Sequence, residues 1–247
     1  MLCTEGAPPH NTTGMTCEGA KEHVKQSADL FECAMEMTRY MHCDAVAVST
    51  AFAADDAKYK HWNHLYKSLQ RACKKHFRGE SCVVFHNMMF DALYLNREEI
   101  KRDGTMSWPV AEDAKACAMS GMDVTRCCMQ VMQKMIKCGN QATAHLHKEY
   151  HVTGSDKLTP ADMMDMMCRS FDMDIEYNEA DPKEWRKMMK DMRMLSSLDI
   201  CLMEEGFQMM KDGCFKKCTN ECRKLTGEKP MEMGEWLDEH RDMFERK

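Results

Sequence analysis

Fifteen cysteines are distributed along almost the whole of this 247-residue chain, and no other feature constrains its fold as strongly. They are not gathered into one cluster of the kind that binds a structural metal ion. A cysteine content this high is typical of proteins that fold in an oxidising compartment, where thiols pair as disulfides. We therefore expect a secreted or lumenal, extracellular protein in which disulfides join different parts of the chain.

The apolar residues that normally build a core are scarce. Leucine, isoleucine, valine and phenylalanine together make up only about 14% of the chain. Twenty-eight methionines stand where leucine would be expected. Methionine fills irregular space well but specifies its packing poorly, because it has three rotatable bonds. Disulfides, worth about 2–4 kcal/mol each, would supply the missing stability.

The spacing of the apolar residues predicts helices. They recur every three or four positions between Glu18 and Cys43 and between Asp55 and Phe77, and Ser81 to Leu95 is expected to continue as a third helix. Trp108-Pro109 is expected to open a helical region that ends at Cys138. Because no segment alternates in the way of a half-buried strand, the predicted fold class is all-α.

Later helix starts are marked by a capping residue followed by proline. Thr159-Pro160 and Asp181-Pro182 both have this form, with an acidic residue in the first turn. The second start predicts a long helix that continues to about Met203, before Gly206 interrupts it. A further helix is expected to carry Cys214, Cys218 and Cys222, and a last one to run from about Met231 to Phe244.

The cysteine spacing indicates an internal repeat, because three cysteines recur at a constant offset of 95 residues. They are Cys33, Cys43 and Cys73, matched by Cys128, Cys138 and Cys168. We expect a leader (1–16), two related helical modules (17–105 and 106–205) and a C-terminal helical extension (206–247). Chance matches in a cysteine-rich helical chain are the alternative explanation.

Fourteen cysteines are candidates for disulfides, with a connectivity that the sequence leaves open. They are Cys17, Cys33, Cys43, Cys73, Cys82, Cys117, Cys127, Cys128, Cys138, Cys168, Cys201, Cys214, Cys218 and Cys222. The odd count leaves at least one thiol over, and Cys3 in the leader is the candidate for a bond between copies in a homo-oligomer.

Metal binding is a competing interpretation of two segments. On an extended backbone His145, His147, Glu149 and His151 would share one face, although an exposed polar linker before Gly154 explains them equally. On the helix expected near the C-terminus, Cys214, Cys218 and Cys222 would form one stripe. That stripe permits a zinc site, and disulfides are the favoured alternative.

Several function classes are disfavoured. The 40 acidic residues outnumber the 34 basic ones, which are scattered, so nucleic acid is not an expected partner. No apolar run reaches the roughly 18 residues of a transmembrane segment. We find no nucleophile elbow, paired-histidine protease helix, phosphate loop or dinucleotide turn, so no catalytic residue and no cofactor is implied. Asn11-Thr12-Thr13 is a glycosylation acceptor and agrees with secretion.

The leading hypothesis is a secreted, non-enzymatic binding protein. Its methionine-lined interior or groove would accept an apolar small molecule, a lipid or a partner protein, because soft side chains repack around varied ligands. The alternative is an extracellular structural or storage protein that serves as a sulfur reserve and forms disulfide-linked oligomers. An enzyme with an unusual site is the third possibility.

Overall fold

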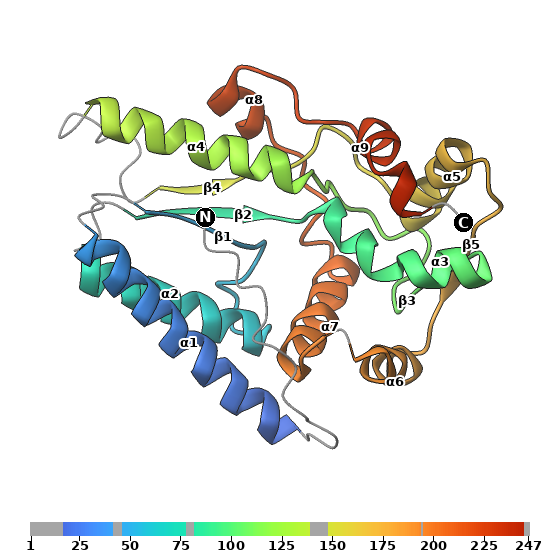
Figure 1. Cartoon of the computed structure of the whole chain (residues 1–247), viewed down its shortest axis with the longest axis horizontal. Coiled ribbons are helices and arrows are strands. Elements are labelled where there is room, and N and C mark those ends of the chain that lie inside the picture. Colours follow the sequence, from blue (N-terminus) through green and yellow to red (C-terminus); the bar gives the residue numbers. More distant parts are fainter. Residues whose placement is uncertain (1–16, 42–45, 78–81, 139–147, 194, 245–247) are drawn as a thin grey trace.

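A parallel β-sheet lies at the centre of one half of the molecule in the computed structural model, which describes residues 17–41, 46–77, 82–138, 148–193 and 195–244. Its strands lie in the order β1 (Val46–Ala51), β2 (Cys82–Asn87) and β4 (Glu149–His151). Helices α1 (Cys17–Tyr40) and α2 (Lys60–Phe77) cover one face, and α4 (Gly121–Cys138) covers the other (Figure 1). This half is therefore a three-layer α/β/α arrangement.

The other half is built around a two-stranded parallel sheet. Strand β3 (Thr105–Trp108) pairs with β5 (Glu176–Glu179), and the helices around this pair enclose the largest cluster of buried side chains. The remaining elements are η1 (Phe90–Asn96), α3 (Arg97–Asp103), α5 (Pro160–Phe171), α6 (Pro182–Met192), α7 (Ser197–Lys211), α8 (Glu221–Thr226), α9 (Met233–Glu239) and η3 (Arg241–Met243). Methionine is a core residue here: Met163, Met164 and Met167 pack in the same cluster as Trp236.

The predicted all-α fold is wrong, and the physical reason lies in how parallel strands are buried. Helices cover both faces of the sheet, so β1 and β2 carry apolar residues on both sides and do not alternate, while β4 is only three residues long. Strand β2 replaces the helix expected from Ser81 to Leu95, and Trp108 ends β3 where a helix was expected to begin. Without alternation, a short apolar strand cannot be distinguished from a buried helix by periodicity.

Two predicted helix starts are confirmed. At α5 the Thr159 side chain accepts a hydrogen bond from the Asp162 backbone N–H at 3.0 Å, and Asp162 accepts from the Thr159 N–H at 2.9 Å. At α6 the Asp181 carboxylate accepts from the backbone N–H groups of Lys183 and Glu184. Local capping chemistry therefore determines both boundaries.

The long helix expected from Asp181 to Met203 is instead two helices. Helix α6 ends where Arg193 adopts a left-handed conformation with φ of 53°. Helix α7 then begins after its N-cap residue, Ser196. The Ser196 side chain accepts a hydrogen bond from the Asp199 backbone N–H at 3.2 Å, in a second reciprocal capping box. Gly206 lies inside α7 and does not interrupt it.

Replacing the α5 cap tests this local control of stability. We expect Thr159→Ala to lower the free energy of unfolding by about 1 kcal/mol, because the Asp162 N–H loses its acceptor. Urea denaturation followed by circular dichroism measures the change. Ser155→Ala, at an exposed position before the helix, is the matched control and should change the free energy by less than about 0.5 kcal/mol. Equal stability of the two variants would contradict the role of the cap.

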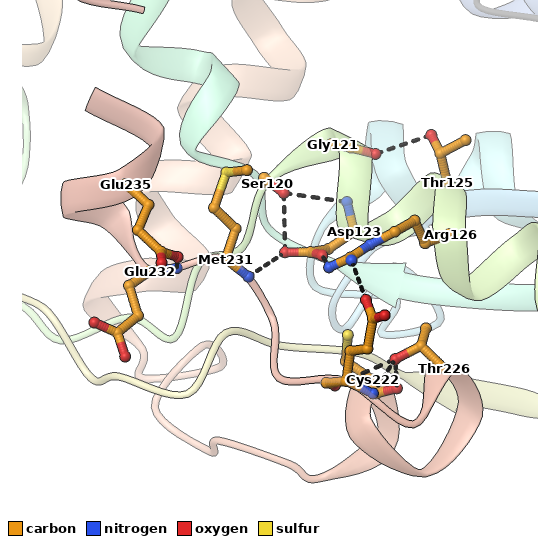
Figure 2. A network of polar contacts seen from close by, with 11 residues as sticks. Ser120, Gly121, Asp123, Thr125, Arg126, Cys222, Thr226, Met231, Glu232 and Glu235 are labelled. Carbon is orange, nitrogen blue, oxygen red and sulfur yellow. Dashed lines mark hydrogen bonds and ion pairs between the residues drawn. The ribbon is translucent and has the colours of Figure 1, made fainter. Parts of the chain in front are cut away.

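A buried carboxylate connects α4 to the C-terminal part of the chain. Asp123 is fully buried and accepts hydrogen bonds from the Ser120 hydroxyl at 2.9 Å and the Met231 backbone N–H at 2.7 Å (Figure 2). It also forms an ion pair with Nη2 of Arg126, whose Nη1 donates a hydrogen bond to the Glu228 carboxylate at 2.6 Å. The network holds the segment before α9 against the start of α4.

One disulfide is present among the described cysteines. It joins Cys117, before α4, to Cys218, before α8, and the two residues are 101 positions apart in the sequence. This bond connects the central part of the chain to its C-terminal segment. No helix in the described ranges is both long enough and apolar enough to cross a membrane.

Candidate functional site

Four polar side chains gather where the parallel strands β1, β2 and β4 end. His86 lies at the carboxyl end of β2, Glu149 and His151 lie on β4, and Tyr66 reaches toward them from α2. In open α/β sheets, ligands bind outside the carboxyl ends of the strands. We call these four residues, together with Gln70, the carboxyl-edge cluster.

Strand register brings the cluster together. The parallel pairing of β2 with β4 sets His86 beside His151, and Val84 beside Glu149. Because alternate residues of a strand share a face, His86, Glu149 and His151 all lie on the face covered by α2. The intervening Phe85 packs with Val124 and Cys127 of α4 on the opposite face.

Glu149 is the centre of the hydrogen-bond network. One carboxylate oxygen accepts a hydrogen bond from the Tyr66 hydroxyl, and the other lies 3.2 Å from His86 Nε2. Gln70 Nε2 donates to the Tyr66 oxygen at 2.7 Å, which orients the phenol. His86 Nδ1 lies 3.2 Å from the Ala51 carbonyl oxygen, so the buried imidazole is held between two acceptors.

These contacts determine the charge of Glu149. Partial burial tends to raise the pKa of the carboxyl group, but the hydrogen bonds from Tyr66 and His86 outweigh it. The pKa of Glu149 is therefore held below its ordinary value, and the group is a carboxylate at neutral pH. An ionised Glu149 favours positive charge on His151.

His151 reaches solvent, as Glu149 does, whereas His86 is buried. Its ring stacks on that of His86, with centroids 4.6 Å apart and planes 15° apart, and it also lies 5.3 Å from the Phe52 ring. Desolvation and the neighbouring His86 lower the pKa of His151 below its usual value of 6.5. A neutral, accessible imidazole of this kind can accept a proton from a bound molecule and return it.

The protonation of His151 is directly measurable. We expect its Cε1–H resonance to titrate in an NMR pH series with a midpoint below 6.5, because the folded environment disfavours the imidazolium. Proton transfer that needs neutral His151 should therefore be half-maximal below pH 6.5 and fall as the pH drops through that midpoint. A midpoint at or above 6.5 would contradict this account of the site.

The predicted metal site is only partly within the described residues. Glu149 and His151 share one face of an extended strand, as the sequence predicts, while His145 and His147 lie outside the described residues. Both Glu149 oxygens are engaged by Tyr66 and His86. Across the described ranges, no three histidine, cysteine or acidic side chains are arranged to hold a metal ion.

Tyr66, Gln70 and His86 were not found by sequence reasoning. His86 follows the apolar run Cys82-Val-Val-Phe85, and a polar residue at the end of a buried strand was the available signal. Recognising it required knowing that the segment is a strand. Tyr66 and Gln70 were assigned to an amphipathic helix, where tyrosine and glutamine carry no specific signal.

The predicted disulfide cysteines are placed very differently from one another. Cys117 and Cys218 are bonded together. Cys73 is buried in α2 and Cys201 is half-buried in α7. Cys3, Cys43 and the glycosylation candidate Asn11 lie outside the described residues, and the side chains of Cys17, Cys82 and Cys138 are not described. The following stand as thiols: Cys33, Cys127, Cys128, Cys168, Cys214 and Cys222.

The predicted helix carrying Cys214, Cys218 and Cys222 is wrong. Only Cys222 lies in a helix, because α8 begins at Glu221 behind Asn220. The Cys222 thiol is within hydrogen-bond contact of the Cys127 thiol on α4. The three cysteines therefore do not form one stripe, and Cys218 points to a different partner from Cys222.

The fold has counterparts among solved structures, although no protein-family model and no curated protein matches the sequence. An NADPH-dependent quinone oxidoreductase from Escherichia coli has a TM-score of 0.68 at 11% identity, over 85% of this chain and 72% of that chain. A nucleoside-diphosphate-sugar epimerase from Staphylococcus aureus has a TM-score of 0.66 at 11% identity, over 93% and 75%. A triphenylmethane reductase from Citrobacter sp. has a TM-score of 0.64 at 10% identity, over 90% and 72%.

These similarities correct the expected function class. The hypothesis of a non-enzymatic binding protein with an all-α fold is wrong, because the parallel α/β fold of this chain resembles that of reductases and an epimerase. The expected secretion stays a prediction. The hypothesis rested on the high cysteine and methionine content. Composition indicates which side chains fill a core, but it carries no information about strand order. At 10–11% identity, the similarity establishes the fold.

Proposed function

We propose that this chain is an enzyme of the oxidoreductase kind, in which the carboxyl-edge cluster transfers a proton at a carbonyl or hydroxyl oxygen of its substrate. The observation that carries the proposal is the exposed His151 stacked on the Glu149-bound His86, at the strand ends where ligands bind in this fold class. The similarity in fold to two reductases supports the same class.

Each residue of the cluster has a separate part in the proton transfer. His151 exchanges the proton with the substrate oxygen, which gains one when a carbonyl is reduced and loses one when a hydroxyl is oxidised. His86 is a positioning residue whose ring stacks on that of His151, and Glu149 is a positioning residue whose negative charge favours the charged form of His151. Tyr66, oriented by Gln70, fixes the Glu149 carboxylate.

This fold implies a dinucleotide cofactor, which requires residues that can hold its pyrophosphate. Structures of the quinone oxidoreductase and the Citrobacter reductase contain NADPH and NADP(H), respectively. A dinucleotide pyrophosphate normally lies against a glycine-rich turn between a strand and a helix. Here the two glycines closest in sequence, Gly14 and Gly19, are five positions apart, and no pair has the G-x-G or G-x-x-G spacing.

The loops after the strands of the β1–β2–β4 sheet also lack a glycine-rich turn. The segments following β1 and β2 contain no glycine, and the segment following β4 contains Gly154. A Cβ at Gly154 would lie 2.1 Å from the Ala118 carbonyl oxygen, so this glycine allows close backbone packing. The described residues therefore do not fit the pyrophosphate of a dinucleotide, and we assign no hydride step to them.

A turnover assay tests the proposal. Because reduction of a carbonyl needs a hydride donor, the protein is supplied with NADPH or NADH and a panel of quinones and aldehydes. Consumption of the reduced nicotinamide would show that a dinucleotide binds here without a glycine-rich turn. We expect His151→Asn to lower kcat about 10²-fold, since a positioned acid or base contributes at least that much. His61→Asn is the matched control, because His61 also pairs with a glutamate, Glu205 at 2.8 Å, away from the cluster. No consumption with any acceptor, or an unchanged rate in His151→Asn, would overturn the proposal.

A second candidate function follows from the missing glycine turn. The same cluster could catalyse proton transfer at the hydroxyl-bearing carbon beside a carbonyl, which requires no dinucleotide. His151 removes the proton, an enediolate forms, and a proton from solvent is returned to the carbon. Incubation of dihydroxyacetone phosphate in D₂O, followed by proton NMR, detects this exchange. Exchange that is lost in His151→Asn, without nicotinamide consumption, would favour this function over the first.

A further inference from the structure

The outer face of α2 carries an uncompensated row of positive charge. Lys60, Lys67, Arg71 and Lys74 recur at spacings of seven, four and three residues, which places them on one side of the helix. Within the described part of the chain, Lys60, Lys67 and Lys74 have no ion-pair partner. By contrast, the neighbouring Lys75 pairs with Glu32 of α1.

This arrangement opposes helix stability. Like charges three or four residues apart on a helix destabilise it. The whole chain has a net charge of −6, so carboxylates are plentiful, yet among the described residues none lines this face. A row of cations left unneutralised in an acidic protein points to an anionic ligand.

The same side chains line an open cavity along α2. The described residues that border it are Ala57, the four cations, His64 and the amides of Asn63 and Gln70, and its volume is about 570 Å³. That volume is large enough to admit a phosphate or diphosphate group. Arg71 is held along the helix, because its Nη2 donates to the Ser68 hydroxyl at 3.0 Å. We call this cavity the α2 groove.

Gln70 connects the α2 groove to the carboxyl-edge cluster. It lines the groove and also donates to the Tyr66 hydroxyl, which is bound to Glu149. Asn63, on the same wall, donates to the Asp55 carbonyl oxygen at 2.6 Å and fixes the loop that follows β1. A ligand whose anionic end occupied the groove would extend toward the strand ends.

We infer that the α2 groove binds the phosphate or diphosphate group of a small substrate, whose uncharged part then reaches His151. The assignment to a substrate rests on the proposed function; the anion binding does not. Lysine ammonium groups bind phosphate as point charges, and the Arg71 guanidinium provides paired donors. The groove is a site on one helix of limited volume, which suits a small polyanion.

Calorimetric titration of the full chain with inorganic pyrophosphate tests the binding. We expect saturable binding at one site that weakens as salt is added. Lys67→Gln/Lys74→Gln should weaken it by at least about tenfold, because two charge-assisted contacts are lost. Lys187→Gln/Lys190→Gln removes the same charge from exposed positions of α6 and should change the dissociation constant by less than about twofold.

Three outcomes would overturn the inference: no saturable pyrophosphate binding, equal weakening in both double variants, or tighter binding of a single-stranded oligonucleotide than of pyrophosphate. Folding is checked by thermal melting. Lys67→Gln/Lys74→Gln should be at least as stable as the parent, because repulsion is removed. His151→Asn should bind pyrophosphate normally, so a failure of turnover and a failure of the groove are distinguishable.

Discussion

Asp123→Ala is expected to lower the free energy of unfolding by about 3 kcal/mol, the lower end of the range found when one partner of a buried ion pair is removed, because Arg126 is partly exposed. The carboxylate is fully buried and serves three donors: the Ser120 hydroxyl, the Met231 N–H and the Arg126 guanidinium (Figure 2). Alanine removes this acceptor from all three donors; Ser120 is buried, while Arg126 is partly exposed and keeps its contact with Glu228. Urea denaturation measures the loss.

A second variant separates the contribution of the charge from that of the hydrogen bonds, and a third, outside the network, is the control. Asp123→Asn keeps an oxygen for Met231 and Ser120 but loses the charge opposite Arg126, so we expect a smaller loss of about 1–3 kcal/mol. Asp165→Ala removes an exposed carboxylate that lies 4.0 Å from Arg169, and should cost less than about 1 kcal/mol. If Asp123→Ala were no more destabilising than Asp165→Ala, the network would not be what holds the C-terminal segment to α4.

Removal of the Cys117–Cys218 disulfide should have an effect of similar size. A crosslink between residues 101 positions apart restricts the unfolded chain strongly. For a loop of about 100 residues, the chain-entropy model gives about 4.7 kcal/mol. We therefore expect Cys117→Ala/Cys218→Ala to unfold at a much lower urea concentration than the parent under non-reducing conditions.

A reductant provides the internal control for this prediction. It should destabilise the parent protein to the level of Cys117→Ala/Cys218→Ala and leave the double variant itself unchanged. Cys33→Ala, at an exposed thiol of α1, should match the parent with and without reductant. Equal stability of parent and double variant in oxidising buffer would show that this bond contributes nothing to the folded state.

Structural features that depend only on residues close together in the chain, such as helix caps, were determined by the sequence alone. The Thr159 and Asp181 caps begin helices where the sequence places them, because each cap needs only a side chain and backbone N–H groups two or three residues away. The shared face of Glu149 and His151 is of the same kind: it follows from an extended backbone, whatever that strand pairs with.

Features that depend on distant parts of the chain were decided only by tertiary structure. Strands β1 and β2 become strands because they pair in parallel and are covered by helices on both faces, and this burial removes the alternation that would mark them. Cys117 finds Cys218 among many cysteines only once α4 and the C-terminal segment pack together.

The candidate site shows the same division. Tyr66, His86 and Glu149 come from three elements, and 83 positions separate the first from the last. No periodicity links residues that far apart. They meet because the parallel order β1–β2–β4 brings the strand ends to one edge and places α2 over them. The side chains were present in the sequence, but strand order, which depends on long-range pairing and burial, determined that they form one cluster.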